Sequence, residues 1–519
     1  MPVIPAGLSG RGPGARTRRQ TIASAAILTV ALLGALLVGA QLGQAALASG
    51  AADAGGFLVV AVGLFIAVGF AVTRNASVGL IVWLCALVLA RLAPGGGLLA
   101  IDRLAFLALV GAWLLELSNG KRTIGRIGLT EFLMLCFIIL SIASAVIPHV
   151  LPAINEDGIP RPLLDLIMSS AFLPFAGFIL ARQILTDEAS VRALLWFLVI
   201  FGIYLALTNI FWLTGPKQLV WPQDIFDESI KTHLGRARGI FINAAITGYA
   251  LIVCFVAAMH LARQPKQRWR PLLLVSAILM LVGIGLTQTR SAWLAAVMVV
   301  VFSAVVMKGW RRWYVIMIIG LLGLVAANWQ QFSSSDREQG GVTSTNETED
   351  RLNAAATAIW AIKQEPFFGW GLGVFPSVNT IHHQAWGNTP WHRGYGIFPH
   401  DTQLGIGAEL GLIGLGLWVL IIGSMLFTSR RAWKALPRGG LIGRELVTSF
   451  WCVAIAWGVT ASLIDMRLFT FANAIFFMFG GMCAGLADRH IAAEAAKEAE
   501  AAAPDPPLRP VIPTDPLLR

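Results

Sequence analysis

Apolar runs of about 18–24 residues recur along the chain and alternate with polar segments. At about 1.5 Å per residue, each run is long enough to cross a hydrocarbon core about 30 Å thick. Backbone groups in lipid must be hydrogen-bonded within their own segment, so these runs are predicted to be helices. The pattern predicts about fourteen membrane spans, possibly twelve. The runs lie at residues 22–47, 54–73, 76–92, 99–117, 128–149, 163–182, 192–214, 239–261, 271–287, 291–307, 313–329, 403–427, 446–464 and 468–486.

Composition agrees with an all-α, polytopic transmembrane helical bundle. The chain is 56% hydrophobic and only 13% charged, and its mean hydropathy is +0.72. A soluble 519-residue protein could not bury so much apolar surface. All five cysteines fall within predicted spans, so they indicate neither a disulfide framework nor a zinc site.

Basic residues gather in every second loop. If the N-terminus is cytoplasmic, these loops all lie on the cytoplasmic side, and the positive-inside rule predicts that both termini are there. The net charge of +11 comes mostly from these loops, so it indicates membrane topology and not nucleic-acid binding. The basic loop residues are Arg16, Arg18, Arg19, Lys121, Arg122, Arg126, Arg263, Lys266, Arg268, Arg270, Lys308, Arg311, Arg312, Arg430, Arg431, Lys434, Arg438 and Arg444.

This topology predicts five regions. Residues 1–20 form a disordered cytoplasmic leader, and 21–329 form about eleven spans with an outer segment at 215–238. Residues 330–402 form a large outer loop containing short helices that caps the bundle, and 403–487 form the last spans. Residues 488–519 form a cytoplasmic tail that could extend the last helix before a disordered, Pro-rich end.

The large outer loop contains a segment with helical periodicity, which Arg351 is predicted to open and Pro366 to close. The glycines of the following FFGWGLGVF segment predict tight turns. A His- and Trp-rich run, HHQAWGNTPWHRGYGIFPH, completes the loop.

Four cationic or titratable residues lie on the outer side, where basic residues are scarce. They are Arg236, Arg238, Arg290 and His400, and the positive-inside rule does not account for them. Arginine presents a planar set of donors that matches phosphate oxygens. The placement therefore suits recognition of a lipid-linked diphosphate.

Four motifs occur here in an order and spacing that resembles the bacterial O-antigen ligase and O-antigen polymerase superfamily. They are RARGIFINAAITGYAL, LTQTRSAWLA, RLNAAATAIWAIKQEPFFGWGLGVF and FPHDTQLGIGAELGLIGLGLW, within roughly residues 200–430. The resemblance implies a GT-C-like membrane glycosyltransferase of the bacterial inner membrane. Such an enzyme takes a glycan from undecaprenyl diphosphate at the periplasmic face and passes it to an acceptor hydroxyl, without nucleotide sugar, metal or cofactor.

Carried over from the family, the catalytic candidates are Arg290, Arg236 and His400. Arg290 matches the arginine that follows the span ending in LTQT, and Arg236 matches an arginine three residues before a glycine. Arg238 is the second candidate for that position and is assigned to substrate binding. His400 takes the place of the histidine before the C-terminal spans.

The helix after His400 also resembles the family at Glu409, Gly411 and Gly414. The chain departs from the family at Asp401, where an asparagine is frequent, and at Ala244, where a proline is frequent. Asp401 is assigned to substrate binding, with its role open.

Chemistry is consistent with these roles. Cleaving a sugar–diphosphate bond leaves negative charge on the departing phosphate, which arginine donors can stabilise by about 3–4 kcal/mol each. His400 could accept the proton of the acceptor hydroxyl, or it could hydrogen-bond the diphosphate and position it. A single displacement would invert the anomeric centre.

Other residues of the large loop have two interpretations. Arg351 could bind substrate, or pair with an acidic neighbour in the same helix. His383 could contact sugar; together with His382 and His392 it offers no closed zinc-ligand set. The loop tryptophans could stack on glycan or anchor the loop at the membrane interface, which we favour. Glu116, Glu131 and Asp465 are interpreted as solvated helix ends.

The preferred function is an O-antigen ligase-like reaction with lipid A-core as the glycolipid acceptor. An O-antigen or exopolysaccharide polymerase and a protein O-oligosaccharyltransferase would use the same donor. A lipid-linked oligosaccharide flippase or secondary transporter belongs to another class, and it would need ionisable groups near the bilayer midplane. The predicted spans are nearly free of charge there, which favours an enzyme.

Overall fold

The computed structural model describes residues 75–92, 100–227, 235–327, 329, 345–392 and 394–501. The predicted leader, the predicted spans 22–47 and 54–73 and the Pro-rich end of the tail lie outside these residues. Within them the regular elements are helices, and one isolated β-bridge joins Ile154 to Pro160. The all-α prediction is confirmed for this part of the chain.

Each predicted span from residue 76 onward coincides with a helix. The N-terminal half contains α3 (Ala76–Leu89), η1 (Ala90–Leu92), α4 (Ile101–Ser118), α5 (Leu129–Val146), α6 (Leu163–Ile167), a π turn η3 (Met168–Phe172), α7 (Leu173–Ile184), α8 (Glu188–Thr214), η4 (Lys217–Leu219), η5 (Gln223–Phe226) and α9 (Ala244–Ala262). The remainder contains α10 (Arg270–Leu286), α11 (Arg290–Val306), η6 (Lys308–Trp310), α12 (Arg311–Ala327), α14 (Thr345–Gln364), α15 (Phe375–His382), α16 (Thr402–Ala435), α17 (Arg444–Ala461), η7 (Met466–Leu468) and α18 (Thr470–Ala501).

Six of these helices, counting Leu163–Ile184 as one, are long and apolar enough to cross a membrane. A seventh span would join α11 to the next helix, although the chain bends there by 109°. The protein is therefore a polytopic helical membrane protein. Fewer helices meet the criterion than the apolar runs predict, because α3 and α10 are short and α4 and α17 carry charged residues.

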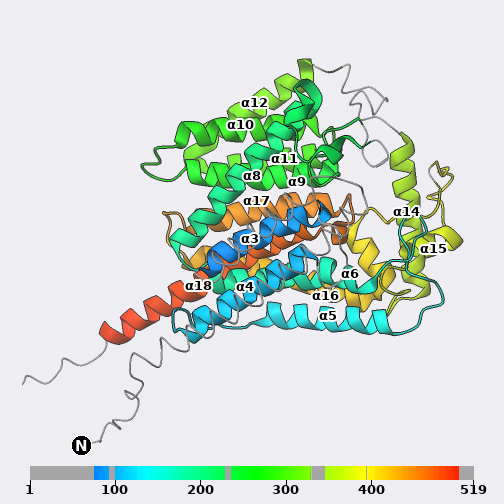
Figure 1. The fold of residues 1–519 in the computed structure, drawn as a ribbon, viewed down its shortest axis with the longest axis horizontal. Coiled ribbons are helices and arrows are strands. Elements are labelled where there is room, and N and C mark those ends of the chain that lie inside the picture. The colour runs from blue at the N-terminus through cyan, green and yellow to red at the C-terminus, as the bar shows by residue number, and fades with distance from the viewer. Residues whose placement is uncertain are drawn as a thin grey trace, which may run out of the picture.

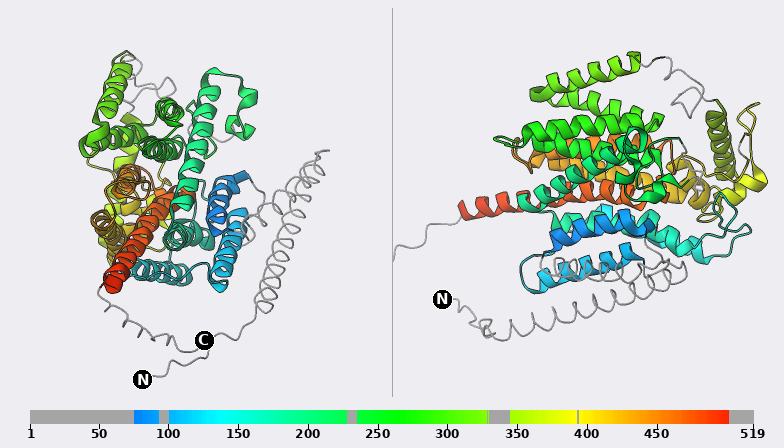
Figure 2. Two further views of the ribbon diagram at one scale, coloured as in Figure 1. Left: turned by 90° about the vertical axis from the view of Figure 1, so that its left-hand side faces the viewer. Right: turned by 45° about the horizontal axis from the view of Figure 1, so that its top comes forward.

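The helices run side by side, with α9 and α18 in the interior of the bundle (Figures 1 and 2). Gly481 and Gly485 let α18 approach the backbone of α7 closely. A Cβ atom added at Gly481 would lie 2.0 Å from the carbonyl oxygen of Phe178, and one added at Gly485 would lie 2.2 Å from the carbonyl oxygen of Arg182. This small-xxx-small spacing is typical of close helix pairs in membranes.

Helices α14 and α15 lie at one end of the bundle, and α14 stands across it (Figure 1). The prediction that Arg351 opens this helix is wrong, because α14 begins at Thr345. Two helical turns thus precede the predicted start, and they carry Glu347 and Thr348. The helix ends at Gln364, just before Pro366, as predicted.

Helix α16 is interrupted at Gly411, where φ is 66° and ψ is −170°. The FFGWG segment lies against this break. The amide of Leu412 donates to the carbonyl of Pro366 at 2.7 Å, and the amide of Gly371 donates to the carbonyl of Glu409 at 2.9 Å. Backbone groups released by the break are therefore hydrogen-bonded by the outer loop.

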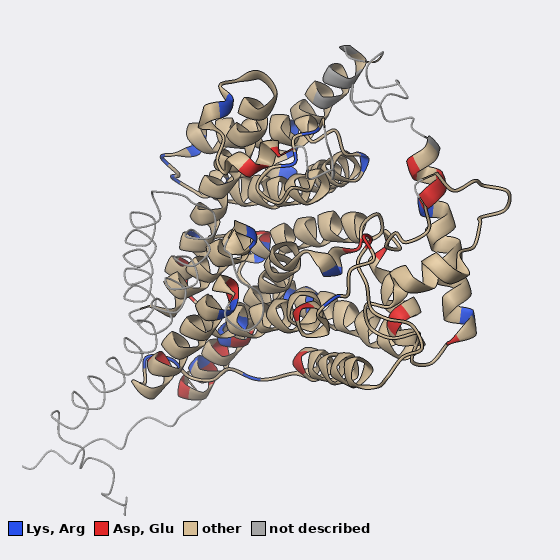
Figure 3. Cartoon of the chain, turned by 45° about the vertical axis from the view of Figure 1, so that its right-hand side comes forward, with Lys and Arg blue, Asp and Glu red and all other residues tan. Residues whose placement is uncertain are grey.

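Long stretches of the helices are free of charge, and charged side chains concentrate toward helix ends and loops (Figure 3). The interpretation of Glu116, Glu131 and Asp465 as solvated helix ends is wrong. They are 8%, 6% and 2% exposed, and each is paired with an arginine. Helix packing covers these ends, and a buried carboxylate needs a partner.

Candidate functional site

Three of the four sequence motifs begin in a loop and continue into the first turns of a helix. The first leads into α9, where the Asn243 side chain accepts hydrogen bonds from the amides of Ala245 and Ile246. The second places Arg290 as the first residue of α11. The fourth leads into α16, where the Asp401 carboxylate accepts from the amide of Leu404 at 2.8 Å. Helix N-termini favour nearby negative charge.

Each of these three loops contains a residue other than glycine in the left-handed region. The φ angles are 49° at Ile242, 46° at Gln288 and 52° at His400. Such conformations cost of order 1–3 kcal/mol and persist where the surrounding structure fixes them, commonly at functional sites. The backbone beside the candidate arginines and histidine is thus held in an uncommon shape.

Arg236 and Arg290 converge on the first turns of α14. A guanidinium nitrogen of Arg236 lies 3.3 Å from a carboxylate oxygen of Glu347, and one of Arg290 lies 3.2 Å from the hydroxyl oxygen of Thr348. Arg236 is only 8% exposed. Two cations from separate segments thus contact adjacent residues. We refer to Arg236, Arg290, Glu347 and Thr348 as the arginine site.

Arg238 has a different environment from Arg236. Its guanidinium donates to the carbonyl of Ile225 at 2.9 and 2.7 Å and to that of Asp227 at 2.7 Å. Arg238 is 2% exposed, and burial lowers its pKa. These bonds join Arg238, in the loop that leads into α9, to the earlier part of the outer segment.

His400 lies directly before α16, and the start of this helix is attached to the loop before α18. The hydroxyl of Thr402 donates to the carbonyl of Ile464 at 3.1 Å and accepts from the amide of Met466 at 2.9 Å. Burial raises the pKa of the neighbouring Asp401. The backbone that follows His400 is therefore held by the loop before α18.

A buried ion triad lies beneath this start of α16. The Arg467 guanidinium contacts Glu409 at 2.5 Å and Asp465 at 2.6 Å. A Cβ atom at Gly405 would lie 2.4 Å from an Arg467 nitrogen, so glycine is required for this approach. The triad joins the loop before α18 to the first half of α16.

Sequence reasoning missed Arg161, in the loop between α5 and α6. Its guanidinium lies 5.6 Å from the ring centre of Phe398, two residues before His400. Burial lowers the pKa of Arg161, and the charges of Glu409, Arg467 and Asp465 also act on it. Among the described residues, this guanidinium takes part in no hydrogen bond. We refer to Arg161, His400 and Asp401 as the histidine site.

The outer loop holds the other predicted residues. The His383 ring stacks on Tyr395 at 3.6 Å between ring centres, while His392 lies 2.5 Å from Glu349 and His382 stacks on Trp360. Arg351 is half-buried on α14. Within the described residues, no three His, Cys, Asp or Glu side chains are grouped to hold a metal ion.

Helix α14 carries part of the arginine site and also packs against the helix that follows His400. Its first turns belong to the arginine site, and its second half packs against α16 through Ala358, Ala361 and Ala408. The two sites thus lie at the end of the bundle that α14 covers (Figure 1). The structure brings Arg236 and Arg290 together, whereas Arg238 and His383 are held in contacts of their own.

Residues 275–419 match a family model described as O-antigen ligase. This segment belongs to the O-antigen ligase family. The O-antigen ligase domain extends from within α10 to within α16, and it contains Arg290, Arg351, His383, His400 and Asp401. The sequence resemblance is thereby confirmed over these residues, while Arg236 and Arg238 precede the match. No curated protein matches the chain.

The match to the O-antigen ligase family implies a glycan-transferring membrane enzyme that uses lipid-linked glycans. The large outer loop and two of the motif-bearing helices, α11 and α16, lie inside or overlap the matched domain. The candidate arginine and histidine sites therefore each include part of the domain that carries the family's identity.

Proposed function

We propose that the chain transfers a glycan from undecaprenyl diphosphate to an acceptor hydroxyl, as an O-antigen ligase with lipid A-core as acceptor. The observation that carries this proposal is the convergence of Arg236 and Arg290 on adjacent residues of α14. The Glu347 carboxylate and the Thr348 hydroxyl supply oxygen atoms to these arginines, as phosphate oxygens would. In the proposed donor complex, the diphosphate replaces Glu347 on Arg236.

The reaction we propose is a single displacement at the anomeric carbon. The acceptor oxygen forms a bond to this carbon while the bond from the carbon to the diphosphate oxygen breaks, and the diphosphate departs with both electrons. Arg236 and Arg290 stabilise the charge on the departing diphosphate. The acceptor proton passes to His400, acting as general base, and the anomeric configuration is inverted.

Two further roles belong to the histidine site and the outer loop. Arg161 has donors available near Phe398, two residues before His400, and would hold the second phosphate or the first sugar. Asp401 caps α16 and orients the backbone of His400. We assign Arg351 and the His383–Tyr395 stack to contacts with the glycan, because both lie on the loop that covers this end.

We propose that the arginine and histidine sites face the periplasm from the bacterial inner membrane, with both termini cytoplasmic. Support comes from the basic loop residues, which fall in the loops at the other ends of the helices. The regions 1–20, 21–329, 330–402, 403–487 and 488–519 then serve as leader, bundle, periplasmic cap, last spans and cytoplasmic tail.

The test uses purified protein reconstituted with undecaprenyl-diphosphate glycan and lipid A-core. We expect release of the free carrier diphosphate and glycosylated lipid A-core, with Arg290→Ala abolishing both. The matched control is Arg268→Ala, which removes an exposed cation from a loop at the opposite ends of the helices.

Other outcomes would replace the proposal. Movement of the lipid across the bilayer without bond cleavage would identify a flippase. Carrier release with glycan chains growing on the carrier would identify a polymerase, and glycosylated protein would identify a protein O-oligosaccharyltransferase. Near-normal turnover of Arg290→Ala would refute the arginine site.

A further inference from the structure

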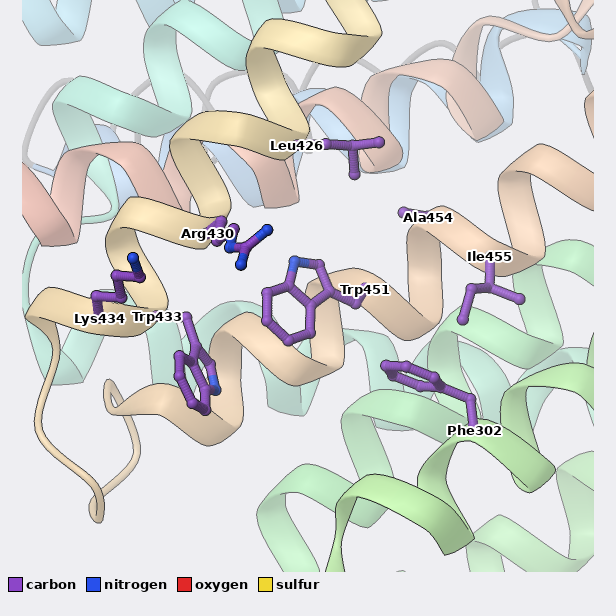
Figure 4. A pocket seen from close by; sticks show the side chains of 8 residues that line it. All are labelled: Phe302, Leu426, Arg430, Trp433, Lys434, Trp451, Ala454 and Ile455. Carbon is purple, nitrogen blue, oxygen red and sulfur yellow. The ribbon is translucent and has the colours of Figure 1, made fainter.

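A groove of about 690 Å³ opens far from both candidate sites, where α16 ends. Helix α17 contributes Trp451, Ala454 and Ile455, α16 contributes Leu426, Arg430, Trp433 and Lys434, and α11 contributes Phe302 (Figure 4). The α16 residues recur every three or four positions, so they share one face of that helix. The volume lies in the range of small-molecule sites, about 300–1,000 Å³.

The aromatic walls of the groove are held in place. The Trp451 indole donates to the Ser429 hydroxyl at 2.9 Å. The Arg444 guanidinium lies 5.0 Å from the ring centre of Trp433, and Arg444 itself donates to the carbonyls of Leu436 and Lys434 at the end of α16. The two tryptophan walls of the groove are thus held in place by contacts within the protein.

Two cations stand at the groove without a carboxylate partner. Neither the Arg430 guanidinium nor the Lys434 ammonium takes part in a hydrogen bond or an ion pair among the described residues. Figure 4 shows the Arg430 guanidinium directed toward Trp451. An apolar cleft with two uncompensated positive charges is complementary to a molecule with an acyl chain and an anionic headgroup.

The position of the groove agrees with such a ligand. From the break at Gly411 to Arg430, α16 rises by about 28 Å at 1.5 Å per residue. A hydrocarbon core is about 30 Å thick, so the groove and the histidine site lie near opposite faces of the bilayer. Basic residues and tryptophans are typical of the membrane–water interface.

We propose that this groove is a binding site for an anionic phospholipid of the inner-membrane leaflet facing away from α14. Its acyl chain lies between Phe302, Leu426 and Ile455, and its phosphate contacts Arg430 and Lys434. The ligand differs from the glycan donor in headgroup and in the face of the membrane at which it binds.

The test is native mass spectrometry of the full-length protein with added phosphatidylglycerol or phosphatidylethanolamine. Two cations at about 1 kcal/mol each predict a preference of roughly 30-fold for phosphatidylglycerol. We expect Arg430→Gln/Lys434→Gln to lose this preference. Arg431→Gln/Arg438→Gln, which removes two exposed cations of the same region that do not line the groove, keeps it.

A second variant tests the groove itself. Ala454→Phe fills the space between the helices, and we expect it to weaken binding of both phospholipids at least tenfold. An unchanged preference in Arg430→Gln/Lys434→Gln, or equal loss in the control pair, would overturn the proposal. Binding of both lipids by Ala454→Phe as by the parent protein would do the same. Each outcome is independent of glycan transfer.

Discussion

Replacing Gly411 by alanine tests how the outer loop is joined to α16. The backbone at Gly411 has φ 66° and ψ −170°, a region that is essentially restricted to glycine. An added Cβ would lie 2.2 Å from the carbonyl oxygen of Phe367 and 2.6 Å from the amide nitrogen of Phe368. Both are backbone atoms, so neither can rotate away as a flexible side chain could.

Three effects of Gly411→Ala add in the same direction. The backbone conformation costs about 1–3 kcal/mol for alanine, and the overlap with Phe367 forces a shift costing about 1–3 kcal/mol. This shift weakens the hydrogen bonds from Leu412 to Pro366 and from Gly371 to Glu409, worth about 1 kcal/mol each. We expect a total loss of about 2–8 kcal/mol of folding free energy.

Gly416→Ala is the matched control. Gly416 lies five residues further along α16, and no atom lies within 4 Å of the position of an added Cβ. Alanine is favoured over glycine inside a helix by about 0.5–1 kcal/mol. The two substitutions should therefore have opposite signs, although the chemical change is the same.

The assay is the fraction of detergent-solubilised protein that stays monodisperse after heating. Heating time and temperature are kept fixed, since unfolding of a large membrane protein is commonly irreversible. We expect Gly411→Ala to lose its folded form at a clearly lower temperature than the parent protein, and Gly416→Ala to match or exceed the parent. Equal behaviour of the two variants would refute the role assigned to the Gly411 break.

Three further substitutions have defined outcomes. Arg467→Met removes the guanidinium that pairs with the buried Glu409 and Asp465 carboxylates, and it should destabilise the protein by about 3–5 kcal/mol. The control Arg192→Met removes only an exposed ion pair within one helix and should change stability by less than about 0.5 kcal/mol. The same heating assay measures both variants. In the proposed donor complex, the Glu347 carboxylate competes with the diphosphate for Arg236. Glu347→Gln removes this negative charge, so the KM for the glycan donor should fall about two- to tenfold. An increased KM would contradict the competition. Burial raises the pKa of Asp401, so the stability that the protonated carboxyl contributes is complete below the ordinary pKa of aspartate and is lost as pH rises through the raised pKa. Asp401→Asn keeps a side-chain oxygen that can cap the helix. The stability of this variant relative to the parent protein should therefore increase as pH rises over this range.

Local features of the chain were predictable from the sequence. Apolar length alone predicts the helices of the bundle from α3 to α12 and from α16 to α18, because a membrane span must satisfy its own backbone. The tight turns expected in FFGWGLG are also confirmed, since Gly369, Gly371 and Gly373 all have positive φ. These features depend on residues close together in the chain.

Contacts between distant segments were not predictable in the same way. Arg236 and Glu347 are 111 positions apart, and their pairing depends on how α14 lies across the bundle. Gly411 could be matched to a family motif, but its contact with Phe367 follows from the fold of the outer loop. Arg161 could have been noticed, because it too is a basic residue in a loop on the outer side, where such residues are scarce.

The position of α14 links the two candidate sites physically. Side chains of its first turns contact both Arg236 and Arg290. Its second half packs against α16 at Ala408, two helical turns after His400. A diphosphate that displaced Glu347 from Arg236 would therefore act on the same rigid helix that contacts the start of α16. Such a ligand can shift the equilibrium between two positions of α14 only by the difference between its binding free energies for those positions. The Arg236–Glu347 contact is the interaction on which that difference depends.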